Sequence, residues 1–177
     1  YYLTALLNLL GPVKRIAGLA GIAIPQRTTK SGKSLTVHTP DHICGTMEFE
    51  NGAIGSIITS FATRFAPYGG RHPITVFGTD GTMKVPDPNE FDGPVLIRGN
   101  DDEDFREARP QFARGHGRSI GLADMALAIR ENRPHRASAE QAFAVLDLMQ
   151  GFLDSSESAR VVAPQSRYVR PPPMEPA

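Results

Sequence analysis

Apolar and polar residues alternate on both sides of Asn51-Gly52, between His42 and Phe61. An Asn-Gly pair favours a two-residue turn with positive φ, so the pattern predicts a β-hairpin. With a two-residue loop, Phe49 lies opposite Ile54 and Gly45 lies opposite Ile58. One face is then apolar and should cover a core. The other face, with residues 42, 44, 46, 48, 55, 57, 59 and 61, is mixed and predicts a partner surface or ligand floor, with an ordinary solvated sheet face as the alternative.

The same kind of turn signal predicts a second hairpin. The runs Ile74 to Gly78 and Thr82 to Val85 flank Asp80-Gly81. That turn predicts one apolar face, formed by Ile74, Val76, Gly78, Met83 and Val85. Since both hairpins have one apolar and one mixed side, we expect them to share one antiparallel sheet that is covered on one face.

Helical periodicity marks three segments. Leucines recur at 3, 6, 7 and 10 before the stop signal Gly11-Pro12, and Ser119 is the predicted N-cap of a helix that ends near Asn132. Ser138 opens the last helix, whose predicted apolar stripe is Ala142, Val145, Leu146, Met149, Phe152 and Leu153. Strands and helices are therefore segregated, which predicts an α+β fold with an open, mostly antiparallel sheet and helices packed on one face.

Composition narrows the class of protein. The chain has 177 residues, 19 basic and 19 acidic side chains, and one cysteine, Cys44. A net charge of zero gives no support for nucleic acid as a partner. One cysteine excludes a disulfide within the chain and predicts a reducing, cytoplasmic location. No apolar run approaches transmembrane length, so no membrane partner is expected. The chain begins with Tyr1, directly in helical periodicity, so we expect it to be a piece of a longer protein.

The loop from Arg64 to Pro73 carries a first set of candidate binding groups. Arg64, Tyr68 and His72 lie in this Gly/Pro-rich segment, which leaves the central hairpin. Loops on a rigid scaffold often bind ligands, and these side chains suit hydroxyl-rich compounds. The alternative is a solvated loop or a subunit contact. The five histidines share no helix at ligand spacing, so no metal site is predicted.

A glycine-rich segment, Gly115 to Gly121, precedes the second helix. Its spacing differs from the dinucleotide fingerprint, and no strand leads into it within a βαβ unit, so it does not predict a Rossmann site. Backbone N–H groups at a helix start, with Arg118 beside them, suit a carboxylate or phosphate. His116 of this segment is therefore a candidate substrate ligand, with a flexible cap loop as the alternative.

Tyr1 and Thr4 lie one turn apart at the start of the first helix. An ordinary tyrosine has a pKa of about 10, so it needs a cationic neighbour to exchange protons near neutral pH. The sequence shows no such neighbour close to Tyr1.

Several segments, taken in order, resemble the C-terminal domain of the Gfo/Idh/MocA (glucose–fructose oxidoreductase / inositol dehydrogenase) family. They are Asp41 with F-E-N-G-A-I-G at Phe49 to Gly55, G-T-D-G-T at Gly78 to Thr82, A-I-R-E-N-R-P at Ala128 to Pro134, and S-A-E-Q-A at Ser138 to Ala142. The resemblance extends from Tyr1 to about Val162. It implies a dihydrodipicolinate-reductase-like domain at residues 1–163, followed by a proline-rich tail at residues 164–177.

The resemblance implies a two-domain oxidoreductase. Family members have an N-terminal Rossmann domain that binds NAD or NADP and carries a catalytic lysine, and they transfer hydride to or from a sugar or polyol. The second domain contacts the substrate and forms homo-oligomers through its open sheet. The family's Rossmann domain is not in this chain, so the chain alone is expected to bind no cofactor and to be inactive.

The first helix departs from the family pattern. Members often carry a D-x-G-x-H-x-x-D motif whose histidine exchanges protons. Aligning L-L-G on Leu9 to Gly11 places that histidine on Tyr1 and the last aspartate on Thr4. The resemblance thus implies Tyr1 as the catalytic position, and Thr4, Arg64, Tyr68, His72 and His116 are the candidate substrate contacts. The alternative is a non-catalytic oligomerisation or interaction module of the same fold.

Overall fold

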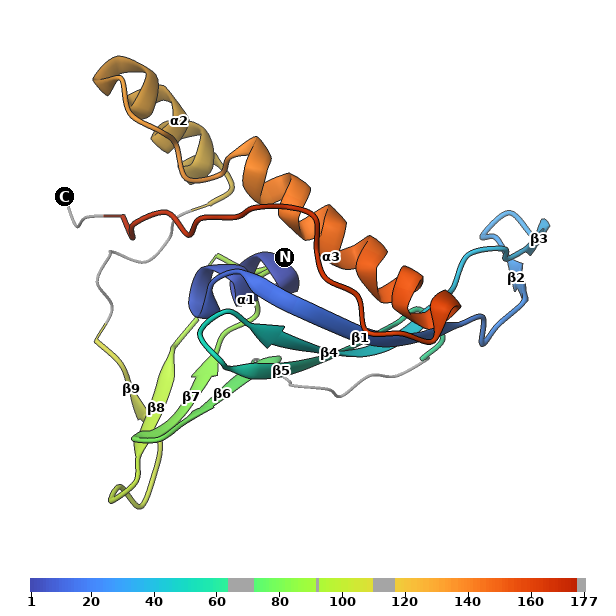
Figure 1. Ribbon diagram of the computed structural model, residues 1–177, viewed down its shortest axis with the longest axis horizontal. Helices are drawn as coiled ribbons and strands as arrows, with labels where there is room; N and C mark the ends of the chain where they lie inside the picture. The colour runs from blue at the N-terminus through green and yellow to red at the C-terminus, as the bar shows by residue number, and fades with distance from the viewer. Residues whose placement is uncertain (64–71, 92, 110–116, 175–177) are drawn as a thin grey trace. The chain divides into compact units, whose positions relative to one another are not determined.

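The structure is a computed structural model that describes residues 1–63, 72–91, 93–109 and 117–174. The fold is α+β, with helices and antiparallel strand pairs, as the sequence predicts (Figure 1). Residue contacts divide the chain into two compact units. The first unit comprises residues 1–5, 67–138 and 171–177, and the second comprises residues 6–66 and 139–170. Each unit is described here by itself.

The second unit is a three-stranded antiparallel sheet with a long helix on one face. The strands β1 (Val13–Gly21), β4 (His42–Phe49) and β5 (Ile54–Ser60) pair in the order β1-β4-β5, and α3 (Ala139–Ser158) lies along them (Figure 1). The helix α1 (Tyr2–Leu10) leads into β1. Two short strands, β2 (Gln26–Thr28) and β3 (Ser34–Thr36), form a separate ribbon.

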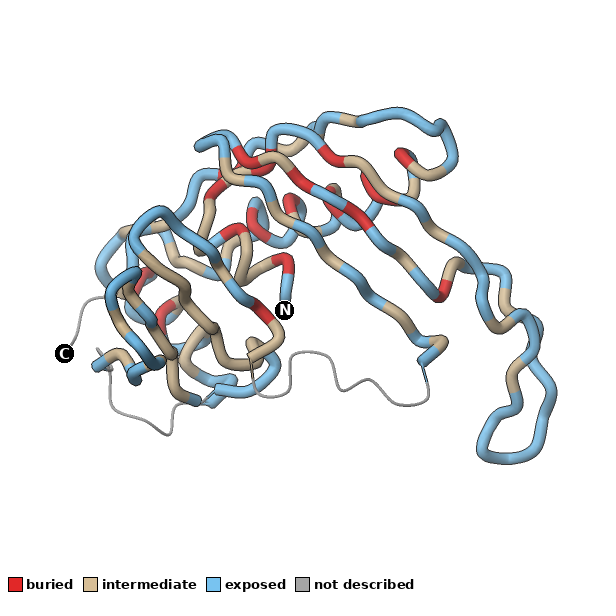
Figure 2. The backbone as a smooth tube through the Cα atoms, turned by 90° about the horizontal axis from the view of Figure 1, so that it is seen from below, coloured by how far each residue is buried: buried red, intermediate tan, exposed pale blue. Residues whose placement is uncertain are grey.

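The core of the second unit lies between α3 and the sheet. Buried positions follow β1, β4 and α3 (Figure 2), and Ile16, Met47 and Phe49 are almost fully buried. Gly18 and Gly45 face each other across β1 and β4, and the ring of Phe152 from α3 packs on both. Two glycines in register therefore form a slot that admits an aromatic side chain where a larger residue would collide with it.

The register of the central hairpin differs from the prediction. The Phe49 N–H donates to the carbonyl oxygen of Ala53, so the loop has three residues, Glu50 to Gly52, and Glu48 pairs with Ile54. The Gly52 N–H donates to the Phe49 carbonyl, and Gly52 has a φ of +86°. This is a turn closed by a glycine bulge. An Asn-Gly pair is compatible with such a turn and also with a two-residue turn. The predicted two-residue loop is wrong by one residue.

That difference exchanges the two faces of β5. Ile57 pairs with Gly45 and so lies on the side that α3 covers, whereas the prediction placed it on the other side. The open face instead carries three apolar side chains on the two outer strands, and their exposed fractions are 75% for Leu19 on β1, and 80% for Ile54 and 65% for Ile58 on β5. The open face is thus more apolar than the sequence indicated.

The first unit contains a four-stranded antiparallel sheet and a helix. The strands are β6 (Ile74–Gly78), β7 (Gly81–Val85), β8 (Leu96–Gly99) and β9 (Arg106–Glu107), paired in chain order, and the helix is α2 (Ser119–Glu131). Among the described residues these strands form their own sheet, so the expected single sheet is wrong. Gly78 pairs with Gly81, which shifts the predicted register by two residues and leaves the predicted apolar face intact.

The helix faces also differ from the predicted ones. Ser119 is inside α2 and Arg118 occupies the N-cap position without a side-chain cap, whereas Asn132 ends the helix in the left-handed conformation as predicted. On α3 the buried residues are Gln141, Ala144, Leu148, Gly151, Phe152 and Ser155, so only Phe152 of the predicted stripe is buried. Small residues on α3 face the sheet because they let the helix backbone approach it. Gly151, for example, lies against Ile16.

Asp41, one of the residues that carry the family resemblance, holds the end of β1. Its carboxylate accepts hydrogen bonds from the Ala23 N–H at 2.6 Å, the Ile24 N–H at 3.2 Å and the Arg27 guanidinium at 2.6 Å. Arg27 also donates to the carbonyl oxygen of Phe61 at 3.0 Å. The backbone hydrogen bond from Ala23, and next the Arg27 side chain, lower the pKa of Asp41. Asp41 therefore fastens the β2–β3 ribbon to the ends of the sheet.

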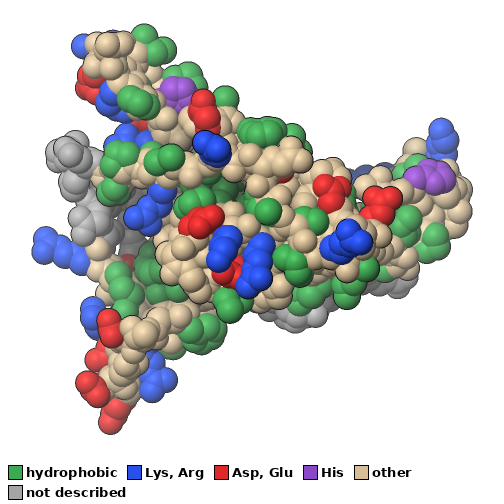
Figure 3. All heavy atoms as spheres, viewed as in Figure 1, with side chains coloured by type: hydrophobic (Ala, Val, Ile, Leu, Met, Phe, Trp, Pro, Cys, Tyr) green, Lys and Arg blue, Asp and Glu red, His purple; other side chains and the backbone are tan. Residues whose placement is uncertain are grey.

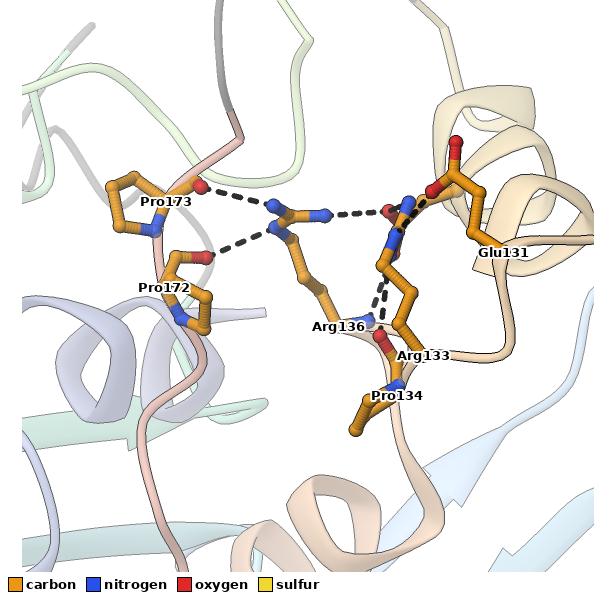
Figure 4. A network of polar contacts seen from close by, with 7 residues as sticks. Glu131, Arg133, Pro134, Arg136, Pro172 and Pro173 are labelled. Carbon is orange, nitrogen blue, oxygen red and sulfur yellow. Dashed lines mark hydrogen bonds and ion pairs between the residues drawn. The ribbon is translucent and has the colours of Figure 1, made fainter. Parts of the chain in front are cut away.

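A buried carboxylate in α2, that of Asp124, holds the segment that follows this helix. Asp124 accepts hydrogen bonds from the Arg133 and Arg136 guanidinium groups and from the Arg136 N–H, at distances of 2.6 to 3.0 Å. The backbone hydrogen bond from Arg136 is the main cause that lowers the pKa of Asp124. Arg136 also donates to the carbonyl oxygens of Pro172 and Pro173 (Figure 4). The proline-rich tail is thereby bound to the segment that follows α2.

Candidate active site

Tyr1 lies beside a cation that is far away in the sequence. The Arg118 Nη1 donates a hydrogen bond to the Tyr1 Oη at 3.0 Å, and both residues belong to the first unit. The Tyr1 carbonyl oxygen accepts the first helical hydrogen bond, from the Ala5 N–H, so Tyr1 is fixed at the start of α1. The structure therefore supplies the cationic neighbour that the sequence did not reveal.

The loop from Pro86 to Phe91 completes this cluster. The guanidinium carbon of Arg118 lies 5.3 Å from the centre of the Phe91 ring and 5.5 Å from the centre of the Tyr1 ring. Both distances lie within the range of a cation–π contact. The Tyr2 hydroxyl donates to the Asp87 carboxylate at 3.1 Å. Partial burial, and next this hydrogen bond, raise the pKa of Tyr2, so Tyr2 stays a neutral phenol near pH 7.

Asp87 fixes the shape of that loop. Its side chain accepts the Asn89 N–H at 2.9 Å, and its backbone carbonyl accepts the Glu90 N–H at 2.9 Å. These hydrogen bonds form a compact turn of the kind that aspartate favours. The turn connects Tyr2 on α1 with Phe91, which lies against Arg118. We call Tyr1, Tyr2, Asp87, Phe91 and Arg118 the tyrosine cluster.

The remaining predicted site residues are placed only in part. Thr4 is half-buried on α1, one turn after Tyr1. The His72 Nε2 lies 2.9 Å from the carbonyl oxygen of Pro94, and a carbonyl can only accept, so Nε2 carries the proton. His72 is therefore hydrogen-bonded to the segment that leads into β8. Arg64, Tyr68 and His116 lie outside the described residues, and their proposed roles stay predictions.

The sequence had no local signal for this cluster. Arg118 precedes a helix and was considered only as an anion ligand, while Asp87 and Phe91 lie in a turn that carried no recognised motif. Three well-separated segments would have to be placed together to predict it. The available signal is a chemical one. A tyrosine that exchanges protons needs a cationic neighbour, and Arg118 is a cation at the end of the glycine-rich segment that precedes the second helix.

The described residues show no cluster of three or more side chains suited to a metal ion. Their strands pair antiparallel throughout, whereas a Rossmann dinucleotide site needs parallel strands, so the described strands do not form a Rossmann site. None of its helices has the length and apolar character needed to cross a bilayer. On the face that Figure 3 shows, basic and acidic side chains are interspersed, which agrees with the net charge of zero.

Comparison with solved structures shows what this fold is similar to. A levoglucosan dehydrogenase in complex with NADH and L-sorbose aligns with a TM-score of 0.73 and 19% identity, covering 93% of this chain and 48% of that one. An NAD binding oxidoreductase from Klebsiella pneumoniae aligns with a TM-score of 0.75 and 19% identity, with the same coverage. This chain thus spans about half the length of these structures.

A third structure is more distant. An oxidoreductase from Agrobacterium radiobacter in complex with NAD+, L-tartaric acid and magnesium aligns with a TM-score of 0.61 and 15% identity, covering 90% of this chain and 46% of that one. At these identities the likeness establishes the fold. A comparison with curated proteins gives no match.

The family is established by a sequence model. The model described as "Oxidoreductase family, C-terminal alpha/beta domain" matches residues 6–163, which is most of the chain. The match covers Asp41, the central hairpin and both C-terminal helices. The predicted resemblance is confirmed, and the chain belongs to the Gfo/Idh/MocA oxidoreductase family, as its C-terminal domain.

Proposed function

We propose that this chain is the substrate-binding and oligomerisation domain of an NAD(P)-dependent dehydrogenase that acts on a sugar, polyol or related hydroxy compound. The family match over residues 6–163 is the observation that carries the proposal. Levoglucosan dehydrogenase, which shares the fold, has been solved with NADH and L-sorbose and with NADH and levoglucosan. An N-terminal Rossmann domain of the full-length protein would bind the cofactor, and we expect the enzyme in the cytoplasm.

The tyrosine cluster supports Tyr1 as the residue that exchanges the proton of the substrate hydroxyl. The resemblance aligns Tyr1 with the family's histidine, and Arg118 lies at hydrogen-bond distance from the Tyr1 hydroxyl. A bound nicotinamide would take or give the hydride. This chain would hold the substrate next to Tyr1, with Thr4 on the following turn, and loop residues Arg64, Tyr68, His72 and His116 as further contacts.

The test is a hydride-transfer assay on the full-length protein. NAD and NADP are each supplied with a panel of sugars and polyols that includes levoglucosan and L-sorbose, and nicotinamide absorbance is followed. Removing a general acid-base group typically costs a factor of about 10² to 10⁴, so Tyr1→Phe should lose most of the turnover. Arg130→Met, at an exposed position in the last turn of α2 and outside the tyrosine cluster, is the control and should keep it.

Each outcome separates two readings. Turnover that is lost in Tyr1→Phe and kept in Arg130→Met supports the dehydrogenase with Tyr1 as its proton exchanger. Turnover kept in both variants leaves the dehydrogenase and moves the acid-base role to another residue. Absence of turnover on the whole panel favours the second candidate, an interaction module. The departures from the family pattern at Tyr1 and Thr4 and the exposed apolar sheet face support this candidate.

We also propose that the open sheet face pairs two copies of the chain. Leu19 on β1 and Ile54 and Ile58 on β5 expose apolar side chains on the same face of the sheet, and Cys44 of β4 pairs with both Leu19 and Ile58. Such a surface is unusual on a monomer and typical of an interface. Lys14 and Arg15 form ion pairs with Glu48 at its edge, and these hydrogen bonds, first that from Lys14, lower the pKa of Glu48.

Adjacent isoleucines provide a matched test of this face. Ile58→Lys places a charge on the open face and should reduce the molecular mass measured by light scattering while the circular dichroism spectrum is kept. Ile57→Lys places the same charge on the side that α3 covers, so it should reduce stability instead. A folded Ile58→Lys variant of unchanged mass would place the interface elsewhere.

A further inference from the structure

We propose that Arg118 is a positioning residue that orients the Tyr1 hydroxyl toward a substrate oxygen. This inference rests on the proposed dehydrogenase function and adds a residue to it. Arg118 lies just before α2, and Tyr1 lies just before α1, so the pair joins the starts of two helices.

The direction of the hydrogen bond is fixed by chemistry. A guanidinium group has N–H donors and no acceptor, so the Tyr1 Oη must be the acceptor in its contact with Arg118. The Tyr1 O–H proton therefore points away from Arg118, toward another acceptor. Tyr1 is 61% exposed, so that acceptor is a ligand or water rather than a buried group. Tyr1 is thereby presented as a proton donor.

The guanidinium group is held in place by aromatic rings. Arg118 lies against the rings of both Tyr1 and Phe91 at cation–π distance, and the turn built by Asp87 holds the segment that carries Phe91. Stacking on two rings restricts a long side chain that would otherwise sample many rotamers. Within the described part of the chain Arg118 makes no ion pair that would compete for it. Tyr2 ties the same turn to α1 through Asp87.

The proton step balances in the direction of carbonyl reduction. A nicotinamide bound by the proposed Rossmann domain would supply hydride to the carbonyl carbon, and the Tyr1 O–H bond would break to give its proton to the carbonyl oxygen, so that the product would be an alcohol. Tyr1 is left as a phenolate whose oxygen accepts the same hydrogen bond from the positively charged Arg118. A charge-assisted hydrogen bond is stronger than a neutral one, so Arg118 favours the product side of this transfer. Water then returns a proton to Tyr1.

The experiment is a double-mutant cycle on the full-length protein. We measure kcat and KM for the wild type, Arg118→Met, Tyr1→Phe and the double variant. Because Arg118 acts through Tyr1, Arg118→Met should lower kcat about tenfold with KM changed by less than about twofold, and the double variant should be no slower than Tyr1→Phe alone. Arg118→Lys keeps one donor and should recover part of kcat. Arg130→Met, an exposed arginine in the last turn of α2, is the control.

A second measurement is independent of turnover. In protein labelled with ¹³C at the tyrosine Cζ, the resonance that disappears in Tyr1→Phe belongs to Tyr1. Its chemical shift should change in Arg118→Met and stay constant in Arg130→Met, because only the first variant removes the hydrogen bond to the Oη. An unchanged Tyr1 resonance overturns the inference.

The kinetic outcomes are equally distinct. An Arg118→Met effect that persists in the Tyr1→Phe background overturns the inference, because Arg118 would then act on something other than Tyr1. Wild-type turnover that is insensitive to Arg118→Met overturns the inference and leaves the proposed function intact. A wild type without turnover on any substrate overturns both.

Discussion

The slot between Gly18, Gly45 and Phe152 makes a quantitative prediction about stability. A Cβ at position 45 would lie 2.4 Å from both Cδ1 and Cε1 of Phe152 and 2.9 Å from the carbonyl oxygen of Ala17. Ordinary carbon contacts are about 3.5 to 4.0 Å, so the ring would have to move by more than about 1 Å. Phe152 is only 3% exposed, so its ring is enclosed by other protein atoms. We therefore expect Gly45→Ala to lower the free energy of unfolding by about 3 kcal/mol, at the upper end of the cost of overpacking.

The assay is urea-induced unfolding followed by circular dichroism, with the midpoint and the slope fitted separately. Gly121→Ala is the control, because nothing lies within 4 Å of that Cβ on α2, and alanine in place of a helical glycine should stabilise by about 0.5 to 1 kcal/mol. Phe152→Leu in the Gly45→Ala background should cost less than the sum of the two single changes, since both act on one contact. A Gly45→Ala free energy within about 0.5 kcal/mol of the wild type, at equal slope, would refute the reasoning.

Two further predictions concern the buried carboxylates. Asp124→Asn removes the negative partner of the half-exposed Arg133 and Arg136 and should cost about 2 kcal/mol in urea unfolding, as for a lost hydrogen bond to a charged group. Asp104→Asn at an exposed position should cost nothing measurable, and equal stability of the two variants would contradict this. The pKa of Asp41 is lowered in the folded state, so its stabilising effect is complete above the ordinary carboxyl pKa of about 4 and is lost as the pH falls toward the lowered value. The difference in melting temperature between wild type and Asp41→Asn should therefore shrink below about pH 4, and a difference independent of pH would argue against the ion pair.

How much the sequence predicts depends on the kind of signal. Alternation and turn residues located the hairpins of β4–β5 and β6–β7, because these signals are local. They did not determine the register, since Asn-Gly is compatible with a two-residue loop and with a three-residue loop that ends in a glycine bulge. An error of one residue exchanged Ile57 and Ile58 between the faces, while an error of two residues in β6–β7 preserved both faces.

Helix faces are harder to predict, because apolar character alone does not identify the side of a helix that packs against a sheet. On α3 the side toward the sheet combines Leu148 and Phe152 with small and polar residues, such as Gly151 and Ser155. The Ser155 Oγ accepts a hydrogen bond from the Gly18 N–H at 3.0 Å. The apolar residues Leu146 and Met149 lie on the exposed side instead. Close approach of backbones depends on tertiary geometry and leaves no periodic apolar signal. The contact between Tyr1 and Arg118 joins residues 117 positions apart, so it also depends on tertiary structure and leaves no local signal in the sequence.

The three-residue turn at Glu50 to Gly52 has a consequence for how this family can vary. Inserting or deleting a single residue there would leave a well-formed hairpin, but it would turn Ile54 and Ile58 inward and bring Ile57 to the surface. Changes of an even number of residues would preserve the surface of β5. Natural variation in this turn should therefore occur in steps of two, or be accompanied by a compensating bulge, wherever the exposed side of the strand is under selection.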